Sequence, residues 1–494
     1  MKTFKMRWLF VIFVALTMIA AACGGNDDDS DAGSGEPAAP ATQAPAAPDE
    51  PEPEPEPEET APQPEEPEAT VEAPEEEEPE FQPAPTAEPE PEIELTATWR
   101  GVTADTITIG VSYLDIDFLV EIGRYPTSWG DQELVIRALA DDINNRGGIN
   151  GRRVEVVIDK YNPVLATEAE AACLRLTEDN EVFAVLFGFL GPAEVANVCI
   201  VDQQETILVG GTITQDRLAL ARAPWVNERA DREVASRALL TLLNDDGELQ
   251  GRSIAVVADL SAASQLEEVA DLVRGFGVEP VLVVATSSPV ADLVAQNQEW
   301  AALSERIRVA GADTLLVVGN PSAAIENSAL YGLDVDIWTA DASGLNNLGS
   351  NVDPETARGA ISATSMTDSQ VFESDPRFKE CLDAFNAAHP DIEVKNPSNL
   401  EEGDMDWFTG IFGHCRFFQI FEMLATAAGP NLTNETFAQA IENAGEFSIA
   451  SQPYASFGPG KYSSNDSFQL VAYDPDVGTV GETVPIGPMR DATP

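Results

Sequence analysis

Histidine is scarce in this chain of 494 residues, and its scarcity excludes several kinds of chemistry. The only two histidines, His389 and His414, stand too far apart to give the spacing of a zinc site. His414 directly precedes Cys415, and adjacent residues on a helix do not face each other, which argues against a Cys–His nucleophile pair. We therefore expect no metal site, no cofactor and no enzymatic activity.

Basic residues are the second deficit. The chain has 27 Lys and Arg against 85 Asp and Glu, a formal net charge of −58, and none of the basic residues lies in 24–98. The part of the chain beyond residue 98 is itself strongly acidic. Such a charge repels phosphate backbones and anionic lipid, so nucleic acid is not expected as a partner.

Long apolar runs are absent except at the N-terminus, so we expect no membrane-spanning helix. Lys2, Lys5 and Arg7 precede an apolar run over residues 8–22, which has the length of a signal-peptide core. Small residues then lead to Cys23 in a pattern similar to a bacterial lipobox. We expect a lipoprotein signal peptide at 1–22 and lipid attachment at Cys23, which would hold the protein outside the cytoplasm at a membrane surface. An ordinary secretory signal with an incidental cysteine is the alternative.

Residues 23–98 are rich in Pro, Glu, Ala and Asp. A segment of this composition does not bury enough apolar surface to offset the entropy lost on ordering. We expect a disordered, extended linker that carries the folded part away from its anchor, with an acidic interaction tail as the alternative.

Four cysteines remain beyond Cys23. An even number in an exported protein suggests two disulfides, although buried free thiols are the alternative. Three pairings are possible. Proximity in the sequence favours Cys173 with Cys199 and Cys381 with Cys415.

From about residue 103, short apolar stretches alternate with stretches of helical periodicity. We expect strands at 106–111, 154–159, 182–188, 206–211, 253–260, 280–286, 313–320 and 335–341. We expect helices at 130–145, 166–179, 192–204, 231–246, 264–277, 292–311, 323–332, 375–390 and 408–429. Strict alternation predicts an α/β fold with doubly wound parallel sheets, and the length favours two lobes. Residues 454–476 are expected to form a hairpin or short strands around a Gly-Pro-Gly turn.

The glycine-rich stretch "GGING", residues 147–151, raises the question of a phosphate site. In such a site the glycines follow a strand and open a helix. Here they close a helix and lead into a strand, so we expect a structural corner in which Gly147 and Gly148 take positive φ.

A family resemblance rests on the same region. The segment "WGDQELVIRALADDINNRGGINGRRVEVVIDKYNP" (129–163) resembles the opening of type I periplasmic binding proteins, and is most similar to the branch that binds leucine, isoleucine and valine. Residues 183–214 resemble the next two βα units of that branch, and "FGPGKYSSNDSFQLVAYDPD" resembles its ending.

The resemblance implies two α/β lobes joined by a three-segment hinge, with lobe 1 at 103–224 plus 360–458 and lobe 2 at 225–359 plus 459–484. It implies a monomeric substrate-binding protein of an ABC importer, which captures a small polar solute between the lobes and delivers it to a membrane permease. A ligand sensor of the same fold is the alternative. A secreted hydrolase is a third reading, but it needs a nucleophile or metal set that the sequence does not offer.

The resemblance also implies site residues, all at the carboxyl ends of expected strands. They are Trp129, Gly191, Thr212 and Thr214 in lobe 1, and Ser261, Ser264, Asn320 and Asp341 in lobe 2. Trp129 would cover the apolar part of a ligand, and Asp341 would pair with a cationic group. Helix capping is the alternative for Thr214 and Asp341. Two departures from the family pattern weaken the case for leucine: Gly191 stands where relatives have a serine, and no tyrosine lies near Ser261.

Overall fold

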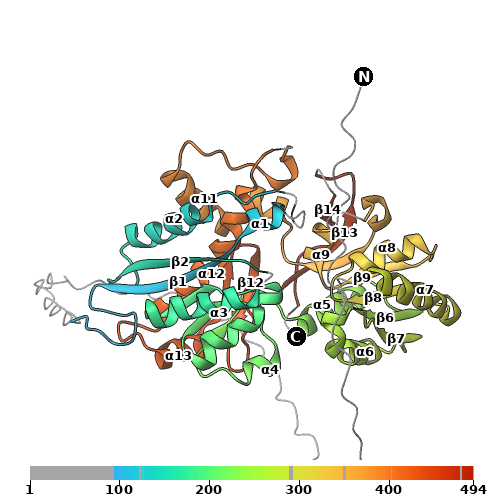
Figure 1. Cartoon of the computed structure of the whole chain (residues 1–494), viewed down its shortest axis with the longest axis horizontal. Helices are drawn as coiled ribbons and strands as arrows, with labels where there is room; N and C mark the ends of the chain where they lie inside the picture. Colours follow the sequence, from blue (N-terminus) through green and yellow to red (C-terminus); the bar gives the residue numbers. More distant parts are fainter. Residues whose placement is uncertain are drawn as a thin grey trace, which may run out of the picture. The chain divides into compact units, whose positions relative to one another are not determined.

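The computed structural model of the chain describes residues 94–492, apart from 122–124, 126, 164, 289–292, 349–351, 402 and 479–480 (Figure 1). The expected signal peptide, the lipidation site Cys23 and all but the last residues of the expected linker lie outside the described residues. None of the described helices combines the length and the apolar character needed to cross a bilayer.

The first sheet has five parallel strands in the order β2-β1-β3-β4-β5. The strands are β1 Thr106–Leu114, β2 Arg153–Tyr161, β3 Ala184–Phe187, β4 Ile207–Gly210 and β5 Trp225–Val226. Strands β3 and β4 are buried along their whole length, as expected for apolar strands covered on both faces. We call this sheet and the helices packed on it lobe 1.

Helices cover both faces of the first sheet. In Figure 1, α2 (Gln132–Asn145) and α3 (Ala166–Leu174) lie on opposite sides of it. Two later helices, α11 (Pro376–Ala388) and α12 (Trp407–Ala427), pack beside α2, and α13 (Asn434–Asn443) contacts α12. A single apolar core joins these elements, so the chain returns to lobe 1 after building the second sheet.

The second sheet, lobe 2, has the order β14-β13-β10-β9-β8-β6-β7, with β15 pairing with β13. Its strands are β6 Ile254–Ala258, β7 Leu282–Ala285, β8 Thr314–Val318, β9 Asp336–Thr339, β10 Ile361–Thr364, β13 Ser467–Asp474, β14 Glu482–Pro485 and β15 Arg490–Asp491. The strands from β7 to β10 are parallel, whereas β13, β14 and β15 form an antiparallel edge.

Two separate apolar clusters lie on the faces of this second sheet. One is formed with α5 (Arg232–Asp245) and α6 (Leu266–Gly275), the other with α7 (Leu293–Ala310) and α8 (Ser322–Leu330). The fold is therefore α/β with two helix-covered, largely parallel sheets, as the alternation predicts. The shorter helices are α1 Ile116–Glu121, α4 Gln215–Leu218, α9 Ala342–Asn346 and α10 Asp368–Ser374.

Strand membership differs from the expected lobe boundaries at two points. The strand β5 pairs with β4 in the first sheet, although the boundary was expected before residue 225. The strand β10 pairs with β9 and β13 in the second sheet, although lobe 1 was expected to resume at 360. Both strands are only two to four residues long, and each lies where the chain is about to cross between lobes.

Residues 454–476 form separate short strands around the turn, the second of the two expected forms, and not a hairpin. The strand β12 (Gln452–Phe457) pairs with β11 (Gly445–Ile449) in a separate two-stranded sheet, whereas β13 joins the second sheet. The turn at Gly458–Lys461 lies between them. This segment is thus one of the crossings between the lobes.

The "GGING" stretch forms the expected corner. The N–H of Gly148 donates to the carbonyl of Ile143, closing α2, and both Gly147 and Gly148 have positive φ. A Cβ on Gly148 would lie 2.0 Å from the carbonyl oxygen of Arg152. Glycine is required there because the helix end and the next strand approach so closely.

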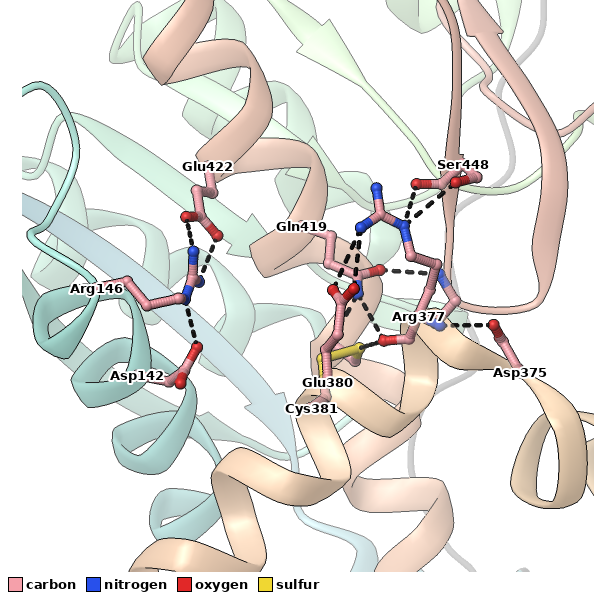
Figure 2. Close-up of polar contacts among 11 residues, drawn as sticks. Asp142, Arg146, Asp375, Arg377, Glu380, Cys381, Gln419, Glu422 and Ser448 are labelled. Atoms are coloured by element: carbon pink, nitrogen blue, oxygen red, sulfur yellow. Dashed lines mark hydrogen bonds and ion pairs between the residues drawn. A yellow bond between two sulfur atoms is a disulfide. The ribbon is translucent and has the colours of Figure 1, made fainter.

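Both favoured disulfides are present, Cys173–Cys199 and Cys381–Cys415. The second joins α11 to α12, and Figure 2 shows the polar contacts around it. Gln419 of α12 donates to the carbonyl of Arg377 and accepts from Ala450 N. About one turn further along α12, Glu422 accepts two hydrogen bonds, of 2.5 and 2.8 Å, from Arg146 at the end of α2. These contacts fix α12 against three neighbouring segments of lobe 1.

Candidate functional site

The loop after β3 is built by buried polar contacts. The side chain of Asn197 accepts from Phe189 N and donates to Phe189 O, at 2.8 and 2.9 Å. Leu190 N donates to the hydroxyl of Tyr161, at the end of β2. Gly191 follows with a φ of 63° and opens a 3₁₀ helix, Gly191–Ala196. The loop is therefore held in one conformation from both sides.

The loop after β4 lies against the loop after β3. A Cβ on Gly188 would come within 2.9 Å of Gly211 N, which shows how closely the two backbones approach. Thr214 caps α4 by accepting from Arg217 N, at 3.4 Å, and Thr212 is half-buried. The structure thus brings Gly191, Thr212 and Thr214 to adjacent loops, and it shows that Thr214 has a capping role.

Trp129 occupies a fixed position on lobe 1. It is half-buried and meets Tyr125 edge to face, with ring centroids 5.6 Å apart. Its carbonyl oxygen would be 2.7 Å from a Cβ on Gly410, so the segment lies directly on α12. Asp406 N, at the start of α12, donates to the carbonyl of Ser128. The indole is consequently presented by backbone that the helix holds in place.

On lobe 2, the loops after β6 and β8 share Asp259. Its carboxylate caps the 3₁₀ helix Leu260–Gln265 by accepting from Ala262 N, and it also accepts from Asn320 N at 2.8 Å. Asn320 is exposed, and its Oδ1 accepts from Ser322 N. Ser264 is exposed, whereas the side chain of Ser261 lies outside the described residues.

Asp341 caps α9 by accepting from Gly344 N at 2.9 Å. Burial raises the pKa of the Asp341 carboxyl, and the charge of Asp259 adds to the rise. The Gly344 hydrogen bond and the positive charges of Arg232 and Arg229 oppose it. The structure therefore brings Asp341 and Asn320 into one region around Asp259, and it adds two arginines that were not predicted.

Arg229 lies on the chain crossing that follows β5. Its side chain is 56% exposed, and its Nε donates to Glu228 Oε1 at 2.9 Å. Burial raises the pKa of Tyr125, and the charge of Arg229 opposes that rise. Arg229 thus interacts electrostatically with Tyr125 of lobe 1 and with Asp341 of lobe 2. The sequence offered one signal for Arg229: it is a basic residue that closely follows a strand, in a chain that has few basic residues.

A cavity of about 550 Å³ lies away from these residues. It is lined by Met366, Pro376, Arg377, Ile449, Pro453 and Met489, and by none of the predicted site residues. Asp375, Arg377 and Ser448, shown in Figure 2, lie at its wall. Within the described part of the chain, no three His, Cys, Asp or Glu side chains are grouped in a way that would hold a metal ion.

The comparisons with known proteins agree with this architecture. A family model described as "Periplasmic binding protein" matches residues 122–469. This chain belongs to that family. Its members bind solutes without transforming them, so this periplasmic binding protein is not an enzyme, and the family implies an extracytoplasmic location. Among curated proteins, no sequence matches the chain.

Solved structures share the fold at low identity. A possible leucine/isoleucine/valine-binding protein from Rhodopirellula baltica SH 1 is 14% identical, with a TM-score of 0.53 over 77% of this chain and 96% of that one. An ABC transporter substrate-binding protein from Desulfitobacterium hafniense, in complex with Leu, is 15% identical, with a TM-score of 0.55 over 77% and 100%. A solute-binding protein of an ABC transporter from Rhodopseudomonas palustris BisB5, in complex with 3,4-dihydroxybenzoic acid, is 13% identical, with a TM-score of 0.53 over 79% and 98%. The periplasmic binding protein described here therefore has the type I fold.

Proposed function

We propose that this protein is the substrate-binding component of an ABC importer. It captures a small polar solute, such as an amino acid, an amide or a related organic acid, between its lobes and delivers it to a membrane permease. The observation that carries the proposal is that polar loops end the parallel strands of both lobes, while three chain crossings join the lobes at one hinge. Crevices at the carboxyl ends of parallel strands are the usual binding places in open α/β sheets.

The crossings support a hinge because they are bonded to one another. Asn227 N donates to the carbonyl of Tyr462, and Ser464 N donates to the carbonyl of Asn227. The side chain of Gln452 donates to the carbonyl of Glu228. Met366 N, on the crossing after β10, donates to the carbonyl of Ser451. Two rigid lobes that pivot at bonded strands can close on a ligand and present a different face to the permease.

In this proposal, the eight predicted residues form the two walls of the ligand site. Trp129 covers the apolar part of the ligand, and the loops of Gly191, Thr212 and Thr214 supply polar groups from lobe 1. The loops of Ser261, Ser264, Asn320 and Asp341 supply them from lobe 2. The capping bonds of Thr214 and Asp341 orient both side chains without using all of their acceptor capacity.

The test is a thermal-shift screen against amino acids, amides, short acids and polyamines. A ligand present at about 100 times its dissociation constant adds roughly 2.7 kcal/mol to the free energy of unfolding. Trp129→Ala is expected to weaken binding of the hit at least tenfold without changing the circular dichroism spectrum. Trp99→Ala, which alters a tryptophan that is 45% exposed at the start of the described chain, is the matched control. Unchanged affinity in Trp129→Ala would contradict the proposed site.

We also propose that the mature chain is a monomer anchored by lipid at Cys23. Globomycin treatment of expressing cells should then cause the precursor to accumulate, and Cys23→Ser should release the protein from the membrane fraction. The sensor alternative shares the site and differs in its partner. A permease and an ATPase encoded beside this gene support import, whereas a neighbouring signalling kinase supports sensing.

A further inference from the structure

The cavity of about 550 Å³ lies apart from the predicted ligand site, and most of its wall is apolar. Four prolines, two methionines and Ile449 line it. Ile449 is 2% exposed, Met366 and Met489 are half-buried, and the prolines are exposed. The cavity therefore has a buried apolar floor and a rim that reaches solvent. Its volume is within the range of about 300–1,000 Å³ that is usual for the binding sites of small molecules.

The charged side chains at the wall are engaged with the protein itself (Figure 2). The carboxylate of Asp375 accepts from Arg377 N at 2.9 Å and from Ser451 N. Arg377 donates through Nε to Ser448 and through Nη1 to Glu380. Neither charge therefore requires a counter-charge on a ligand.

The amide side chains of Gln370 and Gln469, which also line the cavity, pair with each other. Gln469 is 2% exposed, and its Nε2 donates to Gln370 Oε1 at 2.6 Å and to Ser365 O at 2.8 Å. Gln370 Oε1 also accepts from Thr367 N. A ligand that fills the cavity need not satisfy these amides, whereas a charged group of its own would lose water without gaining a partner.

The wall of the cavity comes from both lobes and from one crossing. Met366 lies on the crossing that follows β10, and its N–H donates to the carbonyl of Ser451. Ile449 ends β11 and belongs to the apolar core of lobe 1. Met489 lies between β14 and β15 of lobe 2. A molecule that contacts all three segments binds one relative orientation of the lobes best, and so favours that orientation.

We propose that this apolar cavity is a second binding site, and that its ligand is a small uncharged aromatic molecule. Proline rings give the rim rigid apolar faces, and methionine thioethers make favourable contacts with the edges of aromatic rings. Met366 and Met489 approach the cavity from different segments, so both can contact one ring system. The formal net charge of −58 further disfavours an anionic ligand.

The probe for this site is prodan, an uncharged naphthalene dye whose fluorescence shifts to the blue in apolar surroundings. The anionic naphthalene dye ANS is its charged counterpart. With the purified full chain at pH 7.5, we expect prodan to bind saturably, at one site per chain, and at least tenfold more tightly than ANS. Hydrogen exchange followed by mass spectrometry should show protection by prodan in peptides that cover 447–453 and 485–490, and none in peptides that cover 129–145.

Variants at Met489 test the location of the site. Met489→Asp places a carboxylate at the wall, and a bound apolar molecule would remove that carboxylate from water, so we expect prodan to bind at least tenfold more weakly. Met489→Trp reduces the volume of the cavity without adding a charge and should also weaken binding. Met489 is half-buried, so both variants are expected to fold, which circular dichroism checks. Met405→Asp is the matched control, because Met405 is 53% exposed and does not line the cavity.

The possible results decide the proposal independently of solute binding. Prodan binding that is equal in the wild type and in the folded Met489 variants overturns this location, as does protection confined to other segments. ANS that binds as tightly as prodan overturns the uncharged class of ligand. An absence of saturable prodan binding overturns the second site altogether. Trp129 does not line the cavity, so the Trp129→Ala test of the solute site is decided separately.

Discussion

At the scale of single residues, ionisable groups beside the chain crossings have pKa values that differ from their ordinary ones. Asp368 is the first residue of α10, directly after the crossing that follows β10. Burial raises its pKa to about 7, and the charges of Asp406 and Glu482 contribute, while Arg416 opposes the rise. Burial lowers the pKa of Arg416 itself to about 10. Asp368 is thus a carboxyl group that titrates near neutral pH.

A stability prediction follows from Asp368. Between about pH 4 and pH 7 the folded state keeps a proton that the unfolded state has released, so raising the pH destabilises the fold by up to about 1.4 kcal/mol per pH unit. Asp368→Asn removes this dependence. We expect the variant to match the wild type near pH 4.5 and to be the more stable of the two at pH 7.5, in urea unfolding followed by circular dichroism. A stability difference that does not change with pH would contradict the assignment.

Residue types predicted some of the candidate site and missed other parts. Thr214 and Asp341 were predicted as site residues because Thr and Asp after a strand are typical both of loops that bind ligands and of helix caps. The structure shows the caps, and the ligand role stays a prediction. The contacts of Arg229 were not predicted. Glu228 binds one edge of its guanidinium, and its charge acts on Tyr125 of lobe 1, which lies far away in the sequence. Contacts between distant segments leave no local pattern.

At the scale of elements, helical and strand periodicity predicted nearly every βα unit. The elements that it did not predict include the helix α13, the short strands β5, β10 and β11, and the strands β14 and β15 at the antiparallel edge of lobe 2. The strand β5 has two residues, too few to show a period, whereas β10 is as long as the predicted β3 and β4 but has Ser362 and Thr364 among its four residues. Periodicity also does not say which sheet a strand joins, which explains why a hairpin and separate short strands were both left open for residues 454–476.

The corner between α2 and β2 offers a prediction at this scale. In Gly148→Ala the new Cβ would collide with the carbonyl of Arg152, in backbone that already has a φ of +72°. We expect a loss of about 2–3 kcal/mol in the free energy of unfolding, because the strained φ and the clash add together.

Gly147→Ala is the control for this variant. Its φ is also positive, at +106°, but no atom lies within 4 Å of the added Cβ. Only the backbone strain applies, so we expect a loss of about 1–2 kcal/mol. Equal losses in the two variants, measured by thermal unfolding, would show that the approach of Arg152 is not what requires glycine.

At the scale of the whole molecule, a buried carboxylate links the crossings to lobe 1. Glu228 lies on the first crossing, and its Oε1 faces both Arg229 and Arg416 of α12. Its backbone carbonyl accepts from Gln452, the first residue of β12, and from Ser464 on the third crossing. Arg416 also lies over the ring of Phe412, 4.3 Å from its centroid. The region about which the lobes would pivot is therefore stabilised in part by an ion pair between buried charges.

Glu228→Gln tests how far this arrangement stabilises the fold. The variant removes the one described carboxylate that forms an ion pair with the buried Arg416, and breaking a buried ion pair from one side costs about 3–5 kcal/mol. We expect a loss of about 3 kcal/mol, seen as a lower midpoint of urea unfolding. Adding Arg416→Met removes the stranded charge and keeps an apolar side chain beside Phe412, so the double variant should recover at least half of the loss. A double variant that is no more stable than Glu228→Gln would show that Arg416 gains little from Glu228, and that the hinge is held by its backbone hydrogen bonds instead.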